Sequence, residues 1–162
     1  IITKRGGHNI FLLHILMPFQ LLVLSWFYFK LTNHIGVKKI IKVVPFIVLP
    51  ILVIQYSVQP ELIKSHNPIG YVLTYLPIIS YALLAIYESI SKAEKSKYNL
   101  INIGVFLYFT TSLLVFVSMN IISTIDEKDF NKIYMFNNGM YVVFLILVFI
   151  NLWKVSQYKK QI

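Results

Sequence analysis

The chain alternates long apolar runs with short polar segments. Each run has close to the roughly 20 residues that a helix needs to cross the hydrocarbon core of a bilayer. No run contains Asp or Arg, and Lys42 and Glu88 stand near run ends, where they can reach water. The apolar runs cover residues 10–29, 40–58, 69–90, 100–122 and 139–155.

Backbone chemistry indicates that these runs are helices. A single strand cannot pair its own amide groups in lipid, whereas a helix pairs nearly all of them internally. The runs are also too long and too uniformly apolar for the strands of a membrane barrel. We therefore expect an all-α fold, a polytopic transmembrane bundle of five spans. The length of 162 residues suggests one domain.

Composition supports lipid as the solvent of this chain. Hydrophobic residues make up 57% of the chain and charged residues 13%, about half the charge of an ordinary soluble domain. There is no cysteine, so a disulfide framework, a thiolate metal site and a thiol nucleophile are excluded.

The net charge of +9 comes from basic residues that lie in short clusters between the apolar runs. This distribution favours anionic lipid headgroups over nucleic acid as the partner. Ten of the 15 basic residues fall in or beside the loop after the first run, the loop after the third run and the tail. The richer side faces the cytoplasm by the positive-inside rule, so we expect an external N-terminus and a cytoplasmic C-terminus.

The residue patterns of soluble enzymes are missing from the sequence. The glycines are scattered, there is no His-Glu-x-x-His, and no apolar run holds a carboxylate pair. Proton or cation transport usually needs an acid within the membrane, and none lies in the middle of a run. We therefore expect a non-enzymatic protein without a metal or cofactor, and rank a transporter or membrane enzyme lowest.

His14 is the only histidine within an apolar run, because His8, His34 and His66 all lie in loops. It could ligate haem or a metal, but no other run offers a second histidine. The favoured interpretation is a hydrogen bond to a carbonyl group or to a neighbouring helix.

The other candidates are neutral polar residues inside or next to the runs. In residues 100–122, small hydroxylated side chains fall on one side of a helix, and a packing stripe is favoured there over a ligand-binding stripe. Asn151 could cap a helix or link two of them. The full set, for ligand binding or for polar contacts between helices, is His14, Gln20, Asn102, Tyr108, Thr111, Ser118, Asn120, Asn138 and Asn151.

Several short stretches together resemble a known family. They are Asn9–His14, Pro18–Gln20, Ser25–Tyr28, Asn102–Gly104, Leu107–Thr110, Phe116, Asn120, Asn138 and Leu152–Lys154. In this combination the chain resembles small bacterial seven-helix membrane proteins, largely uncharacterised and often encoded beside sensor histidine kinases. The resemblance implies a place in the bacterial inner membrane and two further helices before residue 1. The family typically has Glu where this chain has Gln20, and His where it has Asn137.

Three functions follow from these observations. The first is a membrane sensor or signalling accessory that binds a partner kinase or an apolar ligand. The second is a structural subunit of a larger membrane complex, which uncharged polar stripes and short loops would suit. The third is the transporter or membrane enzyme, for which His14 would be the main ionisable residue.

Overall fold

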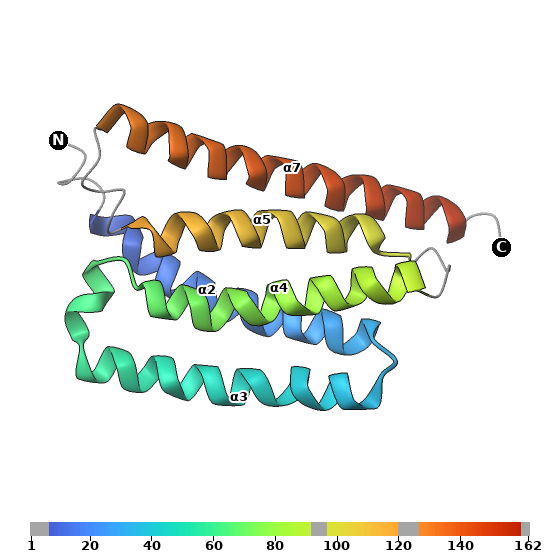
Figure 1. Cartoon of the computed structure of the whole chain (residues 1–162), viewed down its shortest axis with the longest axis horizontal. Coiled ribbons are helices and arrows are strands. Elements are labelled where there is room, and N and C mark those ends of the chain that lie inside the picture. Colours follow the sequence, from blue (N-terminus) through green and yellow to red (C-terminus); the bar gives the residue numbers. More distant parts are fainter. Residues whose placement is uncertain (1–6, 92–96, 120–126, 160–162) are drawn as a thin grey trace.

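The computed structural model describes residues 7–91, 97–119 and 127–159, and it is helical throughout these segments apart from short connections (Figure 1). A short 3₁₀ helix, η1 (Pro60–Lys64), joins the second and third long helices. The described part contains no strand, and the predicted all-α class is confirmed. The long helices are α2 (Gly7–Leu31), α3 (Ile35–Val58), α4 (Pro68–Ser91), α5 (Asn99–Val117) and α7 (Glu127–Lys159).

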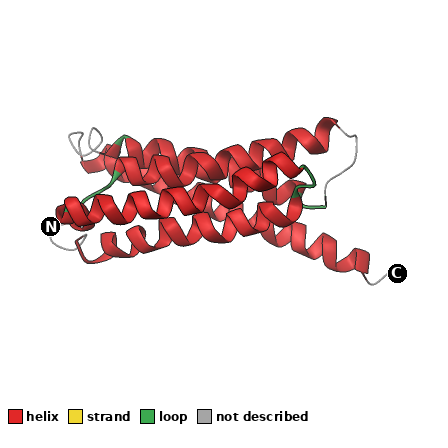
Figure 2. Ribbon diagram, turned by 90° about the horizontal axis from the view of Figure 1, so that it is seen from below, coloured by secondary structure: helices red, strands yellow, loops and turns green. Residues whose placement is uncertain are grey.

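The helices form a bundle with roughly aligned axes (Figure 2). In Figure 1, α3, α4, α5 and α7 follow one another across the bundle, and α2 packs against both α3 and α4. α7 lies at one edge and packs mainly on α5. One end of the bundle carries η1, and we call it the η1 end. The opposite end carries the connection between α2 and α3, and we call it the α2–α3 end.

Four helices are long and apolar enough to cross a membrane. Their candidate spans are Ile10–Leu31, Pro68–Ser91, Asn99–Val117 and Asn131–Gln157. α3 is not among them, although it has 24 residues. It differs in carrying Lys38, Lys39 and Lys42 near its start and two prolines in its middle. The predicted membrane helix bundle is therefore supported by four helices, and a fifth crossing by α3 stays a prediction.

The helix ends differ from the ends of the apolar runs. α7 begins at Glu127, well before the predicted start at residue 139. Its candidate span begins at Asn131, and the first turn of the helix can continue into the polar region beyond the hydrocarbon. α5 ends at Val117, and residues 120–122 of the predicted run lie outside the described residues. The backbone N–H of Ser118 donates to the Leu114 carbonyl, so Ser118 is the C-terminal cap of α5.

Aromatic rings fill the interface between α4 and α5. Tyr71 stacks on Phe116 with centroids 4.4 Å apart, and Tyr75 meets Phe109 edge-on at 4.9 Å. Large apolar side chains also point outward, such as Trp26 at 67% exposure and Phe46 at 74%. Apolar residues on the outside and packed rings inside are what a lipid-solvated bundle requires, since close packing replaces the hydrophobic driving force there.

Candidate functional site

A group of polar side chains lies at the η1 end, where the first turns of α2, the last turns of α3 and the start of α4 meet. It consists of His14, Gln55, Tyr56 and Asn67 together with the backbone carbonyl of Ser65. We call this group the η1 cluster. His14 and Asn67 are buried, at 7% and 1% exposure.

The contacts of His14 define its tautomer. Its Nε2 lies 3.0 Å from the Ser65 carbonyl oxygen, which can only accept, so Nε2 must carry the hydrogen. In the neutral ring Nδ1 is an acceptor, and the Tyr56 hydroxyl then donates to it over 2.8 Å. The imidazole joins α2 to α3 and to the segment that precedes α4.

Asn67 organises the other half of the cluster. Its amide exchanges two hydrogen bonds with the Gln55 amide, at 3.2 and 3.0 Å, and donates to the Tyr56 hydroxyl at 3.3 Å. Its Oδ1 also accepts from the backbone N–H of Gly70 at 3.0 Å, which caps the start of α4. A Cβ on Gly70 would lie 2.9 Å from Asn67 Nδ2, so glycine makes room for this cap.

With His14 neutral, every hydrogen bond of the cluster has one donor and one acceptor. Protonation would place a hydrogen on Nδ1, directed at the hydroxyl that now donates to it. Tyr56 would then have to turn its hydrogen away, and the bond between α2 and α3 would change. The ionisable groups of the cluster are the His14 imidazole and the Tyr56 hydroxyl, so a change of protonation is one chemical response that the cluster can make.

His66 lies beside the cluster. Its ring stacks on Phe116 at a centroid distance of 6.3 Å, and its Nδ1 is buried without a hydrogen-bond partner among the described residues. Burial lowers the pKa of His66 below its ordinary value of 6.5, and repulsion from nearby His14 lowers it further. A neutral His66 therefore suits the packed ring, and a charged one does not.

Gln20 and Asn151 make contacts between elements. Gln20 accepts a hydrogen bond of 3.2 Å from the Tyr75 hydroxyl, which links α2 to α4 halfway along the bundle. Asn151 donates to the Lys97 carbonyl at 3.0 Å and so ties α7 to the segment before α5. Neither residue belongs to the η1 cluster.

The candidates of α5 do not form one stripe. Thr111 donates to the Leu107 carbonyl of its own helix, whereas the neighbouring Ser112 is buried and donates to Asn137 of α7 over 2.8 Å. Ser118 lies beyond the end of the helix. Asn102 is fully buried, and its amide has no hydrogen-bond partner within the described segments.

Tyr108 lies between α5 and α7, stacked on Phe144 at 5.6 Å. Asn138 is exposed, and the contact with α5 is made by its neighbour Asn137 instead. Asn120 lies outside the described residues.

Sequence reasoning identified His14 but missed its partners Tyr56, Gln55 and Asn67. Asn67 carried a usable signal, because an Asn directly before a proline and an apolar run is a helix-start pattern. Tyr56 and Gln55 end an apolar run and resemble ordinary interfacial residues. Only the fold brings them to His14.

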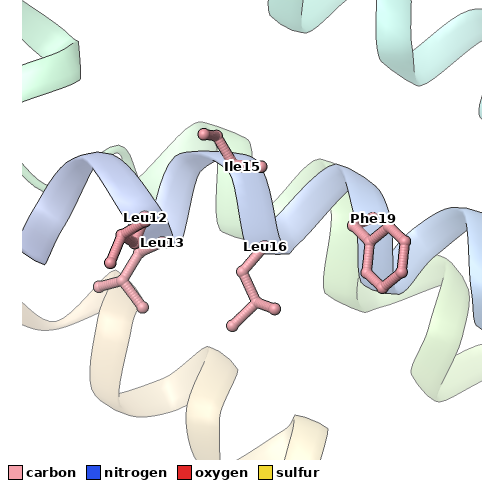
Figure 3. A pocket seen from close by; sticks show the side chains of 5 residues that line it. All are labelled: Leu12, Leu13, Ile15, Leu16 and Phe19. Atoms are coloured by element: carbon pink, nitrogen blue, oxygen red, sulfur yellow. The ribbon is translucent and has the colours of Figure 1, made fainter.

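The outward side of α2 has a shallow apolar pocket lined by Leu12, Leu13, Ile15, Leu16 and Phe19 (Figure 3). Its lining comes from a single helix and contains only carbon side chains, so it suits contact with lipid tails. Within residues 7–91, 97–119 and 127–159, no three His, Cys, Asp or Glu side chains are grouped as a metal site would require.

Comparisons of the chain with protein-family models, with curated proteins and with solved structures found no match.

Proposed function

We propose that this protein is a non-enzymatic membrane sensor or signalling accessory whose input site is the η1 cluster. The observation that carries the proposal is the buried hydrogen-bonded connection from His14 through Tyr56 to Asn67. It joins three parts of the bundle at one point, so a change in one side chain alters how the helices are held together. The proposed partner is another membrane protein, and the family resemblance makes a sensor histidine kinase the first choice.

The input that best fits the cluster is a proton. Histidine is the side chain whose charge normally changes between about pH 5 and 8. His14 is buried in a neutral network, and its protonation removes an acceptor that the network needs. From the η1 end the change can pass along α2, which contacts α4 again through Gln20 and Tyr75.

Charge supports an orientation with the η1 end outside the cytoplasm and α3 as a fifth span. Of the lysines whose side chains the structure describes, six lie toward the α2–α3 end, while Lys64 and Lys132 lie at the η1 end. The proposed location is the bacterial inner membrane with a cytoplasmic C-terminus, and His14 would then sense the external side. The lysines of the α2–α3 end are Lys30, Lys38, Lys39, Lys42, Lys97 and Lys154.

The test is affinity purification of the tagged chain from native membranes in mild detergent, at about pH 7.5 and about pH 5.5. Mass spectrometry of the retained proteins is the measurement. We expect a stoichiometric membrane partner whose retention changes with pH for the native chain. His14→Phe should remove most of that pH dependence, because phenylalanine fills the site without accepting from Tyr56.

Thr111→Val is the matched control, since Thr111 bonds only within its own helix. It should leave both the partner and the pH dependence unchanged. A chain that purifies alone at both pH values would contradict the sensor proposal. A partner whose retention is the same at both pH values, with or without His14, would contradict the proton as input.

A structural subunit of a larger complex is the second candidate. It is favoured by α7, which packs on α5 with one face and leaves large apolar side chains exposed on the other, such as Phe149 at 67% and Trp153 at 61%. Several different membrane proteins in stoichiometric amounts in the same purification, without any effect of His14→Phe, would favour this reading.

A further inference from the structure

The face of α7 that points away from α5 carries a polar residue in an apolar surface. Large exposed side chains recur on this face at spacings of three or four residues, which align on a helix at about 3.6 residues per turn. Asn138 is exposed on the same face, and a Cβ on the adjacent Gly139 would meet no atom within 4 Å. The apolar members are Met135, Val142, Ile146, Phe149 and Trp153.

Asn138 differs from two other asparagines of α7, Asn137 and Asn151. Asn137 and Asn151 are buried on the α5 side and hydrogen-bonded there, to Ser112 and to the Lys97 carbonyl. No described residue hydrogen-bonds to the side chain of Asn138. Asn138 nevertheless lies inside the candidate span Asn131–Gln157, where lipid tails cannot bond to it.

An amide without a partner inside a membrane span is costly, and a partner from outside the monomer would remove that cost. A primary amide is complementary to itself, because its carbonyl accepts and its NH₂ group donates. A twofold axis beside Asn138 would let two such amides exchange two hydrogen bonds. Gly139 would let the two helix backbones approach closely at the same level.

We propose that the outward face of α7 binds a second copy of this chain, with α7 packed on α7 around the Asn138 pair. The interface is symmetric, so each residue near the axis meets its own counterpart. It includes Met135 and Val142 on either side of Asn138. This inference is independent of the sensor proposal, since it uses no residue of the η1 cluster.

Cysteine cross-linking tests the interface without background, because the chain has no cysteine of its own. Single variants Met135→Cys and Val142→Cys place thiols on the proposed face, and Phe46→Cys and Val53→Cys place them on the equally exposed side of α3. The purified full chain is reconstituted into vesicles of phosphatidylcholine and phosphatidylglycerol and oxidised. Disulfide-linked dimers should form at least about fivefold faster for the two α7 variants than for the two α3 variants.

A second measurement tests the amide itself. Asn138→Leu keeps the size of the side chain and removes its hydrogen bonds. Energy transfer between labelled copies, followed while lipid dilutes them, should show a dissociation constant raised about three- to tenfold. Helical circular dichroism confirms that each variant is folded.

Equal cross-linking of the α7 and α3 variants would overturn the interface. An unchanged dissociation constant for Asn138→Leu would overturn the role of the amide pair. A chain that stays monomeric at every lipid dilution would overturn the proposal as a whole.

Discussion

At the residue scale, Asn67 makes the most contacts in the η1 cluster. It caps α4 through Gly70, pairs with the Gln55 amide and donates to Tyr56. Replacement by alanine would remove the cap and leave the Gln55 amide without its partner. We expect Asn67→Ala to lower the free energy of unfolding by about 2 kcal/mol, measured by SDS-induced unfolding in mixed micelles.

The control for this variant is Ser80→Ala in α4, the helix that Asn67 caps. The Ser80 hydroxyl is exposed and bonds only to the Leu76 carbonyl one turn earlier, so its loss should change stability by less than about 0.5 kcal/mol. If both variants unfold at the same SDS concentration as the native chain, the cluster does not hold the helices together as we infer.

The lowered pKa of His66 leads us to expect that the stability of the protein depends on pH. Burial lowers its pKa in the folded state below 6.5, so between the folded pKa and 6.5 the unfolded state binds more protons. Its contribution to stability is therefore complete above about pH 6.5 and is lost as the pH falls below that value. The free energy of unfolding, measured across this range, should depend less on pH for His66→Gln than for the native chain. For His34→Gln, at an exposed position, it should depend on pH as it does in the native chain.

At the element scale, Gly104 determines how closely α5 approaches α7. A Cβ at this position would lie 3.0 Å from Phe144 Cδ2 and 3.4 Å from Leu147 Cδ1. Phe144 cannot easily give way, because its ring is stacked on Tyr108. We expect Gly104→Val to destabilise the chain by about 2 kcal/mol in SDS unfolding, through overpacking of this interface.

Gly139 on α7 supplies the comparison, since nothing lies within 4 Å of an added Cβ there. In dilute detergent, where association is suppressed, Gly139→Val should change stability by less than about 0.5 kcal/mol. A loss of stability equal to that of Gly104→Val would mean that valine at position 104 does not act through the α5–α7 contact.

The helices were predictable from sequence, and their polar contacts were not. Apolar runs of membrane-spanning length predicted the positions of α2 and α4 closely, because the thickness of the hydrocarbon core sets the length of such a run. The end of α5 at Val117 was not predictable, since Met119, Ile121 and Ile122 continue the apolar run beyond it. His14 could be identified because histidine is rare within an apolar run. Its partners on α3 depend on how α2 and α3 pack, and the local sequence does not specify that packing.

At the scale of the whole molecule, polar and basic residues divide the bundle into two unlike ends. The η1 end holds the buried neutral cluster, and the α2–α3 end holds most of the described lysines. In Figure 1, α3 runs from one end of the bundle to the other, alongside the four helices whose composition fits a span. The proposed fifth crossing by α3 would place the two unlike ends on opposite sides of the bilayer.

Labelling of single cysteines from outside the cell tests whether α3 crosses the membrane. Glu61→Cys places an exposed thiol on η1, and Lys39→Cys places one near the start of α3. A membrane-impermeant maleimide should label Glu61→Cys in intact cells and Lys39→Cys only after the cells are opened, because α3 separates the two positions by a full span. Lys132→Cys should behave like Glu61→Cys, and Lys154→Cys like Lys39→Cys. Labelling of positions 61 and 39 from the same side would show that α3 does not cross, and the lysines near its start would then lie on the same side of the membrane as the η1 cluster.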